Sequence, residues 1–188
     1  MTDPSTFFYR NTDLDPQRLR ALVGESLAGC DDGELYLQYA TSESFGFDDG
    51  RLKTASYDSA QGFGLRGVTG ETTGFAHAND LSEGATRRAA ETVRLVAEGH
   101  GGQIALAPPR TNARLYTDDN PLDLVPFARK VALCQEIDAA ARARDPRVAQ
   151  VSVGLSGSWG VVEIVRPDGF VARDVGPLVR LNVSIVAQ

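Results

Sequence analysis

This chain of 188 residues has only two histidines and two cysteines, the residues that provide nitrogen and sulfur ligands to zinc. A catalytic zinc ion needs about three protein ligands, and the usual helical device is a pair of histidines with a glutamate between them. His77 and His100 lie far apart in the sequence, one on an expected strand and one just after an expected helix, where the helix dipole favours a cation. We therefore expect no catalytic, cofactor-binding or metal-binding residue in this chain.

Two short motifs resemble reaction or cofactor sites but lie in the wrong context. Residues 62–67, GFGLRG, match the dinucleotide-binding fingerprint, which works only when its glycines turn a strand into a helix. Here a turn and a second strand pattern follow instead. Ser156 and Ser158 in GLSGSWG come near the spacing of a nucleophile elbow, but the glycine at the fifth position is missing. We interpret Gly157-Ser158 as a hairpin turn, with Trp159 packing at its edge.

The charge and the composition argue against several classes of function. The net charge is −6 and the basic residues do not cluster, whereas a nucleic-acid-binding protein needs a basic face. The sequence has no signal-peptide pattern and no apolar run near the ~18 residues of a membrane span. Cys30 and Cys134 are isolated and do not form a disulfide framework. We expect a soluble, cytoplasmic protein with no nucleic-acid partner and no membrane partner.

Residues 61–78 are the stretch around which the chain is organised. Phe63, Leu65 and Phe75 alternate with glycine or polar residues, and Thr69-Gly70-Glu71 has turn chemistry. The pattern predicts an antiparallel hairpin. Its five glycines indicate that another backbone or a ligand comes close, because glycine otherwise weakens a strand.

The remaining patterns predict an α+β fold with largely antiparallel β-sheets and about three α-helices packed on one face. Strand patterns at 34–47 and 52–57 precede the hairpin and give a meander of about four strands. Helical spacing predicts helices beginning near residues 13, 82 and 123. The third helix should bury one stripe of side chains: Phe127, Val131, Cys134, Ile137 and Ala141.

Three further strand patterns finish the chain, at residues 151–155, 162–165 and 178–187. The last one alternates valine, leucine and isoleucine with polar residues and ends at Gln188 without a turn or a charged tail. Natural proteins usually protect such an open edge. We interpret residues 176–188 as the first strand leading into a further domain.

Long ordered stretches of this sequence resemble the TldD branch of the TldD/PmbA metallopeptidase family. The resemblance is carried by QGFGLRGVTGETTGFAHANDLS at 61–82 and DVGPLVRLNVSIVAQ at 174–188. Intervening segments fit as well: GELYLQYATSES at 33–44, DGRLKTASYD at 49–58 and RVAQVSVGLSGSW at 147–159. It covers nearly the whole chain from about residue 14 onward and indicates the N-terminal domain of such a protein.

The resemblance implies a cytosolic peptidase that pairs with a TldE/PmbA-like subunit, or with itself, and cuts small or unfolded peptides. In that family the zinc ligands come from a His-Glu-x-x-x-His helix and a later cysteine, both in the C-terminal half. Neither motif occurs in residues 1–188, so no catalytic or metal residue is carried over. We expect zinc in a missing C-terminal domain, and this segment should be inactive alone.

The expected organisation has three parts. Residues 1–12 form a loose N-terminal arm unless the aromatic patch Phe7-Phe8-Tyr9 docks onto the body or onto the missing remainder of the protein. Residues 13–175 form the TldD/PmbA-type N-terminal α+β domain, which helps to form the subunit interface and to enclose the active-site chamber. The alternative function is a freestanding ligand-binding or protein-interaction module that uses the glycine-rich hairpin 61–78.

Overall fold

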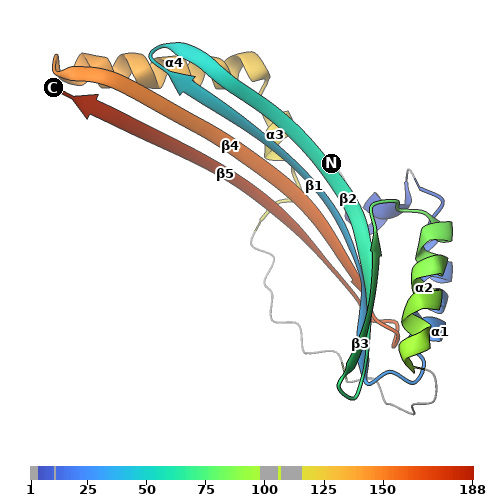
Figure 1. The fold of residues 1–188 in the computed structure, drawn as a ribbon. Helices are drawn as coiled ribbons and strands as arrows, with labels where there is room; N and C mark the ends of the chain where they lie inside the picture. Colours follow the sequence, from blue (N-terminus) through green and yellow to red (C-terminus); the bar gives the residue numbers. More distant parts are fainter. Residues whose placement is uncertain (1–3, 11, 98–105, 107–115) are drawn as a thin grey trace. The chain divides into compact units, whose positions relative to one another are not determined.

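The computed structural model describes residues 4–10, 12–97, 106 and 116–188 (Figure 1). Five strands form one antiparallel sheet in the order β3-β2-β1-β4-β5. The strands are β1 (Asp32–Asp48), β2 (Arg51–Thr69), β3 (Thr72–Ala78), β4 (Val148–Val165) and β5 (Val171–Ala187). The helices are the 3-10 helix η1 (Pro4–Tyr9) and the α-helices α1 (Pro16–Ser26), α2 (Glu83–Ala97), α3 (Pro121–Leu124) and α4 (Phe127–Arg144). The α+β class and the antiparallel pairing are confirmed.

The chain divides into two compact units that share the long strands. Unit 1 comprises Met1–Tyr39, Ala60–Leu115 and Val161–Val175. Unit 2 comprises Ala40–Ser59, Tyr116–Gly160 and Gly176–Gln188. Strands β1, β2, β4 and β5 each contribute residues to both units. The domain boundaries expected after residues 12 and 175 stay predictions.

In unit 1, helices α1 and α2 cover one face of the sheet. Helix α1 begins where the Asp15 side chain accepts hydrogen bonds from the backbone N–H groups of Gln17 and Arg18, with Pro16 in the first turn. Apolar side chains of both helices are buried together with apolar side chains of the strands. The buried set is Leu19, Val23 and Leu27 near α1, Ala85, Ala89 and Val93 on α2, and Leu35, Leu37, Phe63 and Leu65 on the strands.

The N-terminal aromatic patch is docked on unit 1. Phe8 is 1% exposed, and the Phe7 ring lies 4.9 Å from the ring of Tyr39 in β1. Tyr9 donates a hydrogen bond from its hydroxyl group to Glu163 of β4. Of the outcomes left open for residues 7–9, the structure shows docking onto the body.

In unit 2, helix α4 covers β1 and β4 through a small apolar cluster. Phe47, Cys134, Val151 and Val153 form its buried centre, and Val131, Ile137 and Ala141 pack against it. The expected stripe of α4 is therefore confirmed except at one position. Phe127 is 56% exposed, because it lies in the first turn of the helix and meets only the edge of the Phe45 ring.

Two expected strand breaks are wrong. Residues 52–57 and 61–69 belong to the single strand β2. The meander therefore has three strands, β1, β2 and β3, instead of the four that we expected. Gly157 and Ser158 lie inside β4 and form no turn. A Cβ at Gly157 would lie 2.6 Å from Leu122 Cδ2, so this glycine makes room for the short helix α3. Trp159, expected at the edge of a turn, is 4% exposed in the interior of β4.

Candidate functional site

The hairpin of β2 and β3 is confirmed and gives unit 1 a covered face and an open face. The register pairs Gly64 with His77 and Arg66 with Phe75, and directly paired residues share a face. The alternate residues Phe63, Leu65 and Gly67 are buried on the face that α1 and α2 cover. The turn between the strands contains Gly70, whose φ of 55° few residues other than glycine adopt. The open face is therefore the candidate site.

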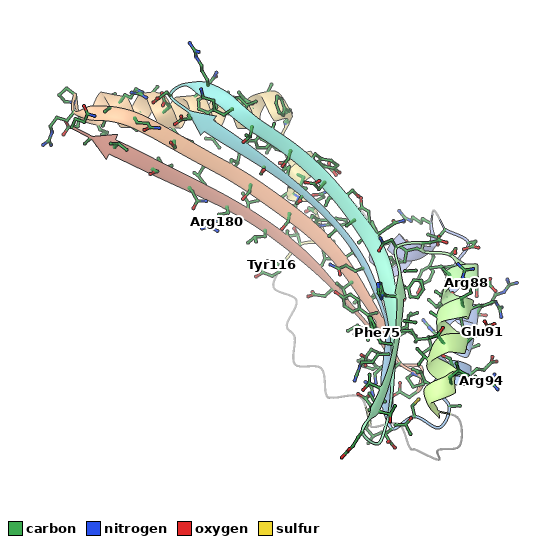
Figure 2. The ribbon with its side chains drawn as sticks, viewed as in Figure 1. Phe75, Arg88, Glu91, Arg94, Tyr116 and Arg180 are labelled. Carbon is green, nitrogen blue, oxygen red and sulfur yellow. The ribbon has the colours of Figure 1, made fainter. Side chains whose placement is uncertain are left out.

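An exposed aromatic pair lies on this open face. Phe75, which is labelled in Figure 2, is 59% exposed. It stacks on His77, with ring centroids 5.5 Å apart and planes inclined by 27°. The Phe75 ring lies over Gly64, where a Cβ would be 3.0 Å from Cε2. At Gly64 the neighbour is thus a side chain and not the backbone or ligand that the glycines predicted, whereas a Cβ at Gly62 would lie 2.7 Å from the backbone oxygen of Ala78. His77 is exposed as well.

A network of four charged side chains ties three strands together beside the aromatic pair. Arg66 Nε lies 2.7 Å from a Glu34 carboxylate oxygen, and Arg66 Nη2 lies 2.7 Å from Asp32 Oδ2. Arg166, at the end of β4, donates from Nη2 to Asp32 Oδ1 at 2.9 Å. The two arginines match the two carboxylates, so the network carries no net charge of its own.

The electrostatics of this network favour its charged forms. Burial alone would raise the pKa of Asp32, but hydrogen bonds from Arg66 and Arg166, with the charge of Arg166, hold that pKa below its usual range. The hydrogen bond from Arg66 to Glu34 raises the pKa of the Arg66 guanidinium, against an opposing effect of burial. A carboxylate that two arginines keep ionised, as at Asp32, makes a structural tie rather than an acid for catalysis.

A second charged cluster lies on the covered face of unit 1. Glu163 is 1% exposed and accepts hydrogen bonds from the Tyr9 hydroxyl group and from Arg173 Nε, the latter at 2.6 Å. Burial, followed by the hydrogen bond and the negative charge of Glu163, raises the pKa of Tyr9. The sequence patterns did not predict this cluster. The sequence does contain one indication of it: Glu163 alternates with Val161 and Val165, so it occupies a position of β4 at which a buried apolar residue is expected.

The cysteines and histidines do not converge on a metal site. Cys30 and Cys134 are free and buried, in unit 1 and unit 2 respectively. His100 lies outside the described residues. Over residues 4–10, 12–97, 106 and 116–188, no group of three or more histidine, cysteine, aspartate or glutamate side chains could hold a metal ion. The described part of the chain thus does not fit a zinc ion, and we derive no step through one.

The two short motifs do not form sites either. Residues 62–67 lie within β2, and the strand continues to a turn and to β3, so no helix N-terminus is available for a pyrophosphate. Ser156 and Ser158 lie within β4, away from any strand-to-helix turn. Among the described helices, none is long and apolar enough to cross a membrane.

Two family models match the chain, and together they cover more than half of it. Residues 33–98 match domain 1 of the PmbA/TldA metallopeptidases, and residues 120–188 match their central domain. The metalloprotease TldD homolog of Haemophilus influenzae is 35% identical over 162 residues, which cover 84% of this chain and 33% of that protein. This chain thus spans about a third of the length of that curated relative.

Solved structures share the fold. A proposed modulator of DNA gyrase from Bacteroides thetaiotaomicron matches with a TM-score of 0.67 at 14% identity, over 92% of this chain and 41% of that one. TldE from Thermococcus kodakarensis matches with a TM-score of 0.58 at 16% identity, over 93% of this chain and 40% of that one. The matched domain models, the curated relative and the shared fold agree: the chain belongs to the TldD/PmbA metallopeptidase family.

Proposed function

We propose that this chain is the N-terminal, non-catalytic part of a TldD-like zinc metallopeptidase of the cytoplasm, which processes small or unfolded peptides. The observation that carries the proposal is the order of the matches, domain 1 followed by the central domain. The described side chains form no cluster that could hold a metal ion. In the network of Asp32, Glu34, Arg66 and Arg166, the positive and negative charges balance. The role of the chain is then to shape and enclose the chamber in which other residues hold zinc.

The proposal includes assembly with a TldE/PmbA-like subunit. The fold shared with TldE supports this role, because related subunits commonly associate through equivalent surfaces. The open face of the β2–β3 hairpin is the surface that we assign to the chamber. It presents an exposed aromatic pair beside an internally paired charge network, which suits weak contact with peptides of varied sequence.

A cleavage assay tests this assignment. The chain alone, with added zinc and an unstructured peptide, should show no cleavage above a protein-free control. A chimera in which this chain replaces the matching third of the Haemophilus influenzae TldD homolog, mixed with its TldE/PmbA-like subunit, should cleave the peptide, and a chelator should stop it. Chelator-sensitive cleavage by the chain alone would overturn the non-catalytic assignment. A chimera that assembles but never cleaves would count against the family role.

A second candidate is a protein-interaction module that uses the hairpin 61–78, and the exposure of Phe75 favours it. The Phe75→Ala variant separates the two functions. If the hairpin lines the chamber, the variant chimera should keep its subunit contact and lose affinity for peptide. If the hairpin is a docking surface, the variant should lose the subunit contact instead, as measured by titration of the labelled subunit.

A further inference from the structure

Gly64 lies between two aromatic residues in one row across three strands of unit 1. On one side the register pairs it with His77 of β3. On the other side it faces β1, which three neighbouring pairs align with β2: Glu34 with Arg66, Ser44 with Ser56, and Gly46 with Thr54. Continuing this alignment along the antiparallel ladder places Tyr36 opposite Gly64. Tyr36, Phe75 and His77 therefore share the open face, and we call these three residues the aromatic platform.

The rings of the aromatic platform are accessible, although neighbouring positions of the strands are buried. Tyr36 is 36% exposed, whereas Leu35 and Leu37 on either side of it are buried on the covered face. Phe75 and His77 are exposed and their ring planes are inclined by only 27°, which leaves one side of the stack open to a further ring. Offset stacking of this kind is one of the preferred arrangements of aromatic rings.

The charged side chain beside the aromatic platform is turned away from it. Arg66 lies directly opposite Phe75, where its guanidinium group could cover the ring. Instead this group is held from the other side by Glu34 and Asp32 of β1, at 2.7 Å each. The charges of the network balance, so it attracts neither an acidic nor a basic group over a distance. Charge complementarity at this face therefore favours an uncharged group.

We propose that the aromatic platform receives an aromatic side chain of the peptide, so that the preferred substrates are peptides with a phenylalanine, tyrosine or tryptophan residue. A ring gains more here than an aliphatic side chain of similar size, because ring pairs are attracted beyond the effect of their buried area. Sequence elsewhere in the peptide is left free. This inference rests on the proposed function, in which the open face lines the chamber, and adds a substrate class to it.

Binding of unstructured peptides to the chain tests this preference. The peptides are identical except for one central residue, which is phenylalanine, leucine, arginine or alanine, and fluorescence anisotropy of an attached label gives each Kd. The phenylalanine peptide should bind about 2- to 10-fold more tightly than the leucine peptide, which corresponds to the gain expected from one ring pair. A leucine or arginine peptide that binds as tightly as the phenylalanine peptide would overturn the inference.

Variants of the aromatic platform locate the preference. Phe75→Leu should remove the advantage of the phenylalanine peptide over the leucine peptide. Gly64→Ala should reduce it, because the new Cβ would lie 3.0 Å from Cε2 of Phe75 and displace the ring. The control is Tyr57→Leu, which removes a 64% exposed ring from β2 in unit 2 and should keep the advantage. Circular dichroism checks that each variant folds. An advantage that survives Phe75→Leu would overturn the inference.

The same measurements distinguish a failure of this inference from a failure of the proposed function. Peptides that bind equally well with and without an aromatic residue would overturn the substrate class alone. A chain that binds none of the peptides would overturn the substrate class together with the assignment of the open face to the chamber.

Discussion

Glu163 carries its charge almost completely shielded from water, at 1% exposed. Its partners are Tyr9 in η1, which is far away in the sequence, and Arg173 in the neighbouring strand β5. A buried carboxylate is costly unless its oxygens are hydrogen-bonded. Here both oxygens have a partner, so the residue fixes the N-terminal helix and the last strand to the same point of β4.

Removing the Glu163 carboxylate should destabilise the protein strongly. Glu163→Ala leaves Arg173 and the Tyr9 hydroxyl group without their partner, and breaking a buried pair costs about 3–5 kcal/mol. We expect the lower part of this range, since the Arg173 side chain is 29% exposed and can recover water. The control is Glu136→Ala, which breaks the exposed pair with Arg129 and should cost about 0–1 kcal/mol. Urea unfolding of both variants gives the comparison, and similar losses would contradict the prediction.

The raised pKa of Tyr9 makes stability depend on alkaline pH. The folded state holds the phenol proton more tightly than the unfolded state, whose tyrosine pKa is about 10. The stabilisation is therefore complete below about pH 10 and is lost as the pH rises further through the folded pKa. The free energy of unfolding of the wild type should fall more steeply above about pH 10 than that of Tyr9→Phe. Parallel pH profiles would show that Tyr9 is not responsible.

At the scale of elements, the covered face of the hairpin depends on the absence of a side chain at Gly67. A Cβ there would lie 2.8 Å from Val93 Cγ1 of α2 and 3.0 Å from Leu27 Cδ2. The glycine therefore sets how closely α2 approaches the sheet, which is a packing requirement of the covered face.

Adding one methyl group at Gly67 should weaken this contact. Gly67→Ala forces the helix or its side chains to shift, and overpacking of this kind costs about 1–3 kcal/mol. The matched control is Gly176→Ala in β5, where a Cβ meets nothing within 4 Å and no loss is expected. Thermal unfolding compares the two variants. A Gly67→Ala protein as stable as the control would show that α2 moves away without cost.

Patterns within short stretches of sequence predicted most helices and strands, whereas features that depend on contacts between distant residues were not predictable. The hairpin was predictable because alternation and turn residues lie within one short stretch, at residues 61–78. The continuity of β4 was not predictable. Gly157-Ser158 is typical of a turn, and the sequence does not show that this glycine instead makes room for Leu122 of α3.

The candidate site was also predictable only in part. The sequence pattern predicted the hairpin itself, but not which charged residues of other strands pair with Arg66. The tie between Asp32, Arg66 and Arg166 joins residues that are far apart in the sequence. No periodicity within one strand indicates which opposite charges will meet across the sheet.

At the scale of the whole molecule, four strands, β1, β2, β4 and β5, contribute residues to both units. Each unit has its own buried centre, with Cys30 in unit 1 and Cys134 in unit 2. Strands that contribute to both units should couple their unfolding, because losing one end of a strand removes ladder partners from the rest.

Thiol labelling tests this coupling. Neither cysteine should react quickly in the native state, and burial also raises the pKa of the Cys134 thiol, which lowers its thiolate fraction. With urea, Cys30 measured in Cys134→Ala and Cys134 measured in Cys30→Ala should become reactive over the same range of concentration. Clearly separated midpoints would show that the units unfold independently.

The order of the strands has a consequence for the chain as it is synthesised. Strand β1 is neighbour to β2 and to β4, yet β4 begins only at Val148, long after β1 ends at Asp48. At ribosomal speeds, the about 100 residues between them take roughly 5–20 s to appear. During that interval the nascent β1-β2-β3 meander exposes the unsatisfied edge of β1, which makes it a natural target for chaperones before its last neighbour arrives.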